Sequence, residues 1–200
     1  MKKLPILLIY SRILFGIVII GLSILRPENF RLIIIMLIAL GLISDIFDGI
    51  IARRLGISTA KMRRMDSTVD QFFWLAVVAA AYIIDPQFFK DNRIQIIIII
   101  SLEAICYLIS FLKFKKEVAT HAISSKIWTL ILFATLIQII AVNHSTILFN
   151  ICLYLGIATR LEIISIVLLI KTWTNDVPSV YHAVLIRKGK PIKRHKLFNG

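Results

Sequence analysis

The chain has 200 residues, of which 58% are hydrophobic, and its mean hydropathy is +0.87. The apolar residues form long blocks instead of the spaced pattern of a soluble domain, which excludes an ordinary soluble fold. A formal net charge of +13 would indicate nucleic-acid binding in a soluble protein. In a membrane protein it follows from the retention of Lys and Arg on the cytoplasmic side, so we expect no nucleic-acid partner.

Six apolar blocks are long enough to cross a bilayer, for which a helix needs about 20 predominantly apolar residues. The predicted spans cover residues 5–25, 31–51, 67–84, 94–112, 124–142 and 146–170. The sequence therefore predicts an all-α, polytopic membrane protein with six transmembrane helices. These helices form a domain at residues 1–171, and a basic cytoplasmic tail follows at 172–200.

Two connecting segments carry more specific signals. Residues 85–87, Asp-Pro-Gln, are typical of a helix stop followed by a turn. In the tail, apolar residues between positions 181 and 186 favour a short interfacial helix.

The distribution of basic residues predicts the orientation in the membrane. Seventeen of the 24 Lys and Arg residues fall on the side of the two termini and of the 52–66 loop, and four fall on the opposite side. The other three, Arg12, Lys126 and Arg160, lie within spans. Loops rich in Lys and Arg are retained on the cytoplasmic side of the membrane, so both termini and the 52–66 loop are predicted to be cytoplasmic. We expect an integral protein of the inner or plasma membrane if the source is bacterial.

Four aspartates lie close together in the sequence, where the second span ends and the third begins. Asp45 and Asp48 are spaced i,i+3, and Asp66 and Asp70 are spaced i,i+4, so each pair shares one face of its helix. The two spans run in opposite directions, which allows the pairs to face each other at one depth. Placing a carboxylate within a membrane costs free energy, so each of these aspartates is expected to have a partner or a function.

A divalent cation would relieve the repulsion among four close carboxylates. Hard oxygen ligands without His or Cys favour Mg²⁺, Mn²⁺ or Ca²⁺ over zinc. Small residues at Gly49 and Ala52 would let a ligand approach closely, and Arg53 would meet phosphate in a bidentate manner. Metal, arginine and a spare carboxylate are what phosphoryl transfer to a hydroxyl needs. The alternatives are a structural cation site, a transporter's ion site, or solvated helix ends.

The segment Asp45-Ile-Phe-Asp48-Gly49-Ile-Ile-Ala52-Arg53, followed by Asp66-Ser-Thr-Val-Asp70, resembles the signature of the CDP-alcohol phosphatidyltransferase family. That signature reads D-x-x-D-G-x-x-A-R, eight residues, G, three residues, D-x-x-x-D. The six-span layout agrees, so the resemblance covers residues 4–171. Lys126-Ile-Trp-Thr129 is similar to the family's K-x-x-T, and Arg12 lies seven residues after Pro5 as in the family's first span.

The resemblance implies a residue-by-residue site. Asp45, Asp48, Asp66 and Asp70 would bind Mg²⁺ or Mn²⁺, as two ions, and Asp70 would be the catalytic base. The resemblance further implies a nucleotide site with Gly49 and Ala52 along its wall and Arg53 in support. Position 62, where the family has a second glycine, carries Met62, which would narrow the nucleotide pocket or displace its wall. Similarly, Ile6 and Ile9 stand where the family's first span carries Asn and Thr.

Three basic residues within spans have two readings each. Lys126, which sits at the family motif, either binds a phosphate of the acceptor or donor or snorkels to the cytoplasmic face. Arg160 either binds an acceptor phosphate or a lipid headgroup, or pairs with Glu103 in the fourth span. Arg12 either takes part in phosphate binding or snorkels to the cytoplasmic face.

The resemblance implies a membrane transferase of phospholipid biosynthesis. It would move a phosphatidyl or related phospho-alcohol group from a CDP-linked donor to a small alcohol and release CMP. Membrane lipid and a second copy of the chain, in a homodimer, are the implied partners. The alternatives are an ion or substrate transporter and a non-catalytic membrane protein with an aspartate cation site. A transporter would place its carboxylates near mid-membrane on broken helices, whereas these lie near one membrane face.

Overall fold

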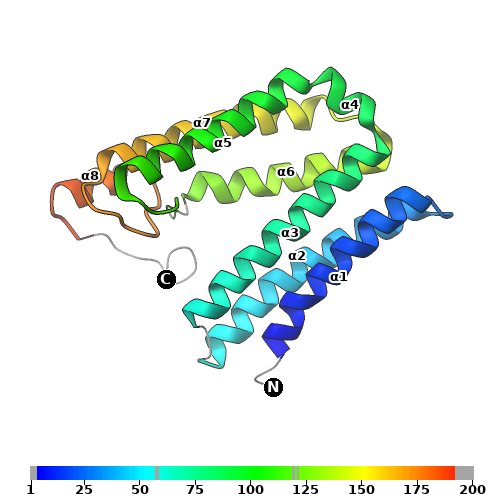
Figure 1. The fold of residues 1–200 in the computed structure, drawn as a ribbon, viewed down its shortest axis with the longest axis horizontal. Helices are drawn as coiled ribbons and strands as arrows, with labels where there is room; N and C mark the ends of the chain where they lie inside the picture. Colours follow the sequence, from blue (N-terminus) through cyan, green and yellow to red (C-terminus); the bar gives the residue numbers. More distant parts are fainter. Residues whose placement is uncertain (1–3, 57–58, 119, 121, 192–200) are drawn as a thin grey trace. The chain divides into compact units, whose positions relative to one another are not determined.

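The computed structural model describes residues 4–56, 59–118, 120 and 122–191, and every regular element in these ranges is an α-helix (Figure 1). The helices are α1 (Leu4–Leu25), α2 (Phe30–Arg54), α3 (Ala60–Ile84), α4 (Pro86–Asp91), α5 (Arg93–Phe114), α6 (Ile123–Val142), α7 (Ile147–Leu169) and α8 (Val180–Arg187). The prediction of an all-α membrane protein is confirmed.

Five helices of the described part are long and apolar enough to cross a membrane: α1, α2, α5, α6 and α7. The remaining predicted span, 67–84, corresponds to α3, whose apolar part, Thr68–Ile84, is shorter because charged residues occupy its first turns. Six spans therefore remain a sound description of the chain. The side of the membrane on which the termini lie stays a prediction.

The turn predicted after the third span contains a short helix. The helix stop itself is confirmed, since α3 ends at Ile84 and Asp85 is its C-cap. The chain then forms α4 instead of an open turn, because Pro86 suits the first position of a helix and the Asp85 Oδ1 accepts a hydrogen bond from the Phe88 backbone N–H at 3.1 Å. The short helix expected in the tail is present as α8.

The described chain divides into two compact units. The first comprises Met1–Lys90 with Leu136–His144, and the second comprises Asp91–Thr135 with Ser145–Gly200. In the first unit, α1 packs against both α2 and α3 (Figure 1). Its core is aliphatic and aromatic, and the fully buried side chains include Ile9, Ile19, Ile34, Ile38, Phe73 and Val77.

The second unit is built on the packing of α5 and α8 against α7. Its buried cluster comprises Cys106, Ala122, Ile163, Ile166, Val167, Ile170, Val177 and Ala183. Lys113 holds the end of α7, because its Nζ donates to the carbonyls of Val167, Leu168 and Ile170 at 2.8–3.0 Å. These are carbonyls that the last turn of a helix leaves without intrahelical partners.

Basic residues of the first unit also bind helix ends. The Arg26 Nη2 donates to the carbonyl of Ile83 at 2.7 Å, close to the end of α3. The Arg31 Nη1 donates to the carbonyls of Ile140 and Ala141 at the end of α6, at 3.2 and 3.0 Å. Both arginines belong to the minority that the charge bias places on the opposite side of the membrane. Their position is therefore explained by capping of neighbouring helices, where a positive charge is favourable.

Gly41 of α2 leaves room for the ring of Phe73, which projects from α3. A Cβ built on Gly41 would overlap the ring of Phe73, which is 2% exposed. Gly41→Ala is therefore expected to force the ring aside at a cost of about 1–3 kcal/mol, which exceeds the ~1 kcal/mol that Ala gains over Gly in a helix. Thermal unfolding in detergent should show a lower midpoint. In the control variant Gly21→Ala the new methyl group meets nothing within 4 Å, and its midpoint should be equal to or above that of the wild type. Equal midpoints for the two variants would contradict this packing.

Candidate active site

The four aspartates come from two adjacent helices of the first unit. Asp45 and Asp48 lie in the last three turns of α2, and Asp66 and Asp70 lie in the first three turns of α3. The start of α3 is fixed by Thr59, whose Oγ1 accepts a hydrogen bond from the Met62 backbone N–H at 3.2 Å. Such a cap satisfies a donor that the first helical turn leaves free, and so it fixes where Asp66 and Asp70 fall on the helix.

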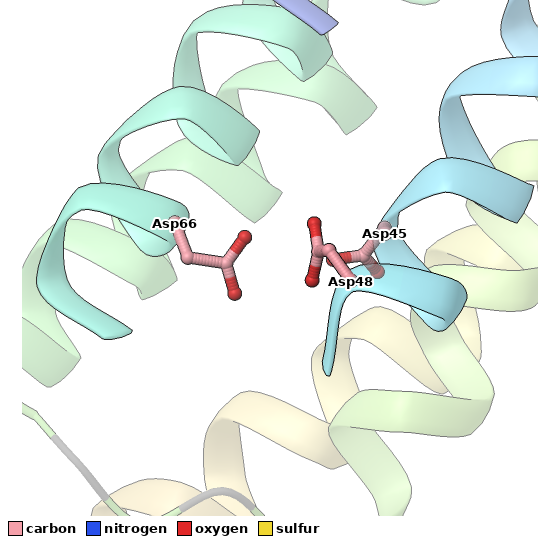
Figure 2. Close-up of side chains that lie close together, drawn as sticks. All are labelled: Asp45, Asp48 and Asp66. Atoms are coloured by element: carbon pink, nitrogen blue, oxygen red, sulfur yellow. The ribbon is translucent and has the colours of Figure 1, made fainter. Parts of the chain in front are cut away.

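The carboxylates of the two helices converge as the spacing predicts. Asp45, Asp48 and Asp66 each offer one carboxylate oxygen, and these atoms lie within 4.8 Å of one another. Figure 2 shows Asp66 on α3 facing Asp48 and Asp45 on α2. The side chain of Asp48 is 2% exposed, whereas those of Asp66 and Asp70 are 29% and 30% exposed. The cluster is therefore closed around Asp48, whereas the side chains of Asp45, Asp66 and Asp70 are partly exposed.

Arg12 of α1 binds all four aspartates. Its Nη1 donates to the Asp45 Oδ1 at 2.9 Å and its Nη2 donates to the Asp48 Oδ2 at 2.5 Å. The same two nitrogens also bind Asp66 and Asp70. Arg12 is 1% exposed, so the expectation that it snorkels to the membrane face is wrong. The hydrogen bonds and charges of the aspartates offset the cost of taking this guanidinium out of water.

The electrostatics favour a further positive charge. Among the described side chains, Arg12 is the one cation bonded to the four carboxylates, and its single charge leaves them with a net negative charge while all four are ionised. Burial raises the pKa of Asp66, and the hydrogen bond and charge of Arg12 oppose that rise. The atoms of the aspartates that could ligate a metal are carboxylate oxygens, which suit a hard divalent cation such as Mg²⁺ or Mn²⁺. The residues present therefore fit a metal site.

The residues expected around a nucleotide lie next to the cluster along the chain. Gly49 is half-buried, Ala52 is buried, and both follow Asp48 on α2. Met62 lies on the first turn of α3, where its side chain is half-buried. The side chain of Arg53 lies outside the described part of the structure, so its role in binding phosphate stays a prediction.

A second buried polar cluster lies in the second unit and joins three helices. The Arg160 Nε of α7 donates to the Glu103 Oε2 of α5 at 2.9 Å, and the guanidinium carbon lies 3.6 Å from the centre of the Trp128 ring of α6. Trp128 in turn donates to the carbonyl of Cys152 at 3.0 Å, and its ring fills the space beside Gly156. Of the two readings of Arg160, the structure shows the pairing with Glu103.

Glu162 does not pair with Arg160, as the two-residue spacing indicates. It accepts hydrogen bonds from the Ser124 hydroxyl at 2.5 Å and from the Val180 backbone N–H at 3.4 Å, and so it connects α6, α7 and α8. Lys126, the other basic residue expected to bind phosphate, belongs to the same unit and has an exposed side chain.

Sequence reasoning missed two features of these clusters. The contact of Arg12 with all four aspartates was not predicted, although a charged residue inside an apolar span is itself a signal that it faces protein and not lipid. The position of Trp128 over Arg160 was also missed. An arginine and a tryptophan on different spans give no pattern in the sequence that would bring them together.

Converging carboxylates at the ends of two apolar helices, with a buried arginine between them, define a membrane-embedded protein with a cation-attracting acidic site. The family model of CDP-alcohol phosphatidyltransferase matches residues 2–170, and the chain belongs to this family. The family comprises membrane transferases of phospholipid biosynthesis, so the class of enzyme predicted from the signature is confirmed at that level. No curated protein and no solved structure matches the chain.

Proposed function

We propose that the protein transfers a phosphatidyl or related phospho-alcohol group from a CDP-linked donor to the hydroxyl of a small alcohol, with release of CMP. The observation that carries this proposal is the convergence of Asp45, Asp48 and Asp66 within 4.8 Å, with Asp70 bound to the same guanidinium. The family match supports the reaction class. The identities of the donor, the acceptor and the metal go beyond the family match and are part of the proposal.

The metal ligands would be Asp45, Asp48 and Asp66, with Asp70 shared between the metal and the reaction. When bound, two Mg²⁺ or Mn²⁺ ions would offset the negative charge of the donor's pyrophosphate and of the transition state. Asp48 is the most buried of the four and has the least access to substrate, so it serves as a fixed ligand. Asp45, Asp66 and Asp70 are more exposed than Asp48, so an acceptor can approach these three carboxylates.

Asp70 is the proposed general base. It takes the proton of the acceptor hydroxyl as that oxygen forms a bond to the phosphorus next to the lipid alcohol. The bond from this phosphorus to the bridging oxygen breaks, and CMP leaves with both electrons of that bond. Positioned proton transfer of this kind contributes about 10²–10⁴ to a rate.

The nucleotide would lie along the small residues of α2. Gly49 and Ala52 give it close access, and Arg53 supports its phosphates. Met62 replaces the family glycine, so the cytidine pocket would be narrower than the family pattern or would have a displaced wall. A different nucleotide in the donor is the alternative to cytidine.

Lys126 is proposed to bind a phosphate of the acceptor or donor, whereas the contacts of Arg160 with Glu103 and Trp128 support a structural role for Arg160. We further propose that the site opens at the cytoplasmic face, that residues 1–171 form the catalytic domain with a basic tail at 172–200, and that the protein is a homodimer. The charge bias of the sequence supports the orientation, and the resemblance supports the dimer.

The reaction is tested with purified protein, CDP-diacylglycerol and a panel of alcohols that includes glycerol phosphate, inositol phosphate and serine. We expect CMP release that depends on both an acceptor and Mg²⁺ and that stops when a chelator removes the metal. Replacing cytidine by other nucleosides in the donor measures the effect of Met62. Absence of release with every donor and acceptor would favour a transporter or a non-catalytic cation-binding protein.

A further inference from the structure

We infer that Arg12 is a built-in counter-cation that holds the four aspartates together in the metal-free protein and that competes with the metal for them. The inference rests on the proposed metal site. It assigns a role to a residue on α1, which contributes no carboxylate to the site. Arg12 acts here on the ligands and not on the reacting atoms.

The hydrogen bonds of Arg12 indicate that its charge offsets the charges of the four carboxylates, and not that it forms the best possible hydrogen-bonded pair with one of them. All its bonds to the aspartates run through Nη1 and Nη2, and its Nε is buried with no hydrogen-bond partner among the described residues. A guanidinium and a carboxylate pair best through two parallel N–H bonds, and a buried donor without a partner is costly. Arg12 thus bonds to four carboxylates without using all of its N–H donors. A divalent cation that fits the carboxylate oxygens better can therefore displace the guanidinium from them.

Metal and guanidinium exclude each other from the same oxygens. Mg²⁺ requires carboxylate oxygens at about 2.0–2.1 Å, and it repels a second positive charge at the distances at which Arg12 now lies. Arg12 therefore has to withdraw from part of the cluster when metal binds. The same withdrawal removes the contact of Arg12 with Asp70.

The benefit of Arg12 lies in the metal-free state. Four close carboxylates without a cation would repel one another and destabilise the contact of α2 with α3. With Arg12 in place the helices stay packed, and the metal meets ligands that are already assembled. The cost is a weaker apparent affinity, because the metal must displace a bound charge.

Mn²⁺ binding to the purified full-length protein, measured by the electron paramagnetic resonance signal of the free ion without nucleotide, tests the inference. Arg12→Gln removes the charge and keeps a similar length. We expect this variant to bind Mn²⁺ about tenfold more tightly than the wild type, which is within the usual range of coupled sites. Arg26→Gln is the matched control, because Arg26 lies just after α1 and binds only backbone carbonyls among its described contacts. Its Mn²⁺ affinity should equal that of the wild type.

Thermal unfolding gives the second readout. Without metal, Arg12→Gln should unfold at a lower temperature than the wild type, and saturating Mn²⁺ should raise its midpoint by more than it raises that of the wild type. If Arg12→Gln does not fold without metal, a second variant, Arg12→Lys, takes its place. Lysine keeps the positive charge but reaches fewer carboxylates. Its affinity for Mn²⁺ should therefore lie between that of the wild type and that of Arg12→Gln folded in the presence of metal.

Equal or weaker Mn²⁺ binding by Arg12→Gln would overturn the inference and make Arg12 a permanent part of the metal-loaded site. Absence of Mn²⁺ binding by all variants would overturn it as well. These results are independent of CMP release. If Arg12→Gln binds Mn²⁺ more tightly and no donor is turned over, the counter-cation role stands and the proposed reaction falls.

Discussion

Asp70→Asn is expected to lower the rate of CMP release by about 10²–10⁴, because the amide cannot take the proton of the acceptor hydroxyl. The amide keeps the size of the side chain and one oxygen for the metal, so donor binding should change much less than the rate. Steady-state release of CMP at saturating donor and acceptor measures the effect. A loss in kcat with a nearly constant KM for the donor would identify Asp70 as acting in the chemical step.

Two variants accompany this measurement. Asp48→Asn removes charge from the buried aspartate and should raise the metal concentration needed for half-maximal rate, because Asp48 is proposed as a fixed ligand. Glu28→Gln changes an exposed carboxylate in the turn after α1 and should leave the rate unchanged. If Asp70→Asn keeps more than about a tenth of the wild-type rate, Asp70 is not the base.

Glu103→Ala is expected to give the largest loss of stability in the second unit. It leaves Arg160, which is 5% exposed, without a carboxylate partner inside a bundle of apolar helices. Removing one partner of a buried ion pair costs about 3–5 kcal/mol. The Glu103 side chain is 42% exposed, and Arg160 also contacts Trp128 and the carbonyl of Gly156. We therefore expect the free energy of unfolding to fall by about 2–3 kcal/mol, which is at or below the lower end of that range.

Thermal unfolding in detergent measures this loss, and two further variants interpret it. Glu103→Gln keeps an acceptor for the Arg160 Nε and should lose less than Glu103→Ala. The double variant Glu103→Ala with Arg160→Met removes the orphaned charge and should recover much of the stability, since an apolar replacement of a buried pair is often neutral. If the double variant is less stable than Glu103→Ala, the cost comes from lost packing and not from an unpaired charge.

The parts of the fold that the sequence predicted are those governed by local patterns. Apolar blocks of membrane-spanning length predicted all six long helices, because the hydrocarbon layer sets the length of a helix that crosses it. The spacing of Asp45 with Asp48 and of Asp66 with Asp70 predicted that each pair shares a helix face. The short helix α4 was read as a turn, because a proline after a helix stop signals the break but not whether the next residues form a helical turn.

The contacts that were not predicted join helices far apart in the sequence. Arg12 lies 33 residues from Asp45 and 58 residues from Asp70, and Arg160 lies 57 residues from Glu103. A single charged residue within an apolar span shows that a partner is needed but not which helix supplies it. For Arg160 the fourth span offers Glu103 as a candidate partner, and the sequence alone does not separate this pairing from phosphate binding. For Arg12 the sequence predicts a contact with phosphate or with the membrane face, whereas the structure shows contacts with the four aspartates.

In the proposed reaction the aspartate cluster holds divalent ions on the phosphates of a CDP-linked donor. This role can be tested with a donor that carries sulfur in place of one non-bridging phosphate oxygen, because sulfur binds Mg²⁺ poorly and softer ions well. We expect one diastereomer to release CMP slowly with Mg²⁺ and Cd²⁺ or Mn²⁺ to restore the rate, while the oxygen donor shows no such preference. Equal rates with Mg²⁺ for the sulfur and oxygen donors, at every substituted position, would contradict it.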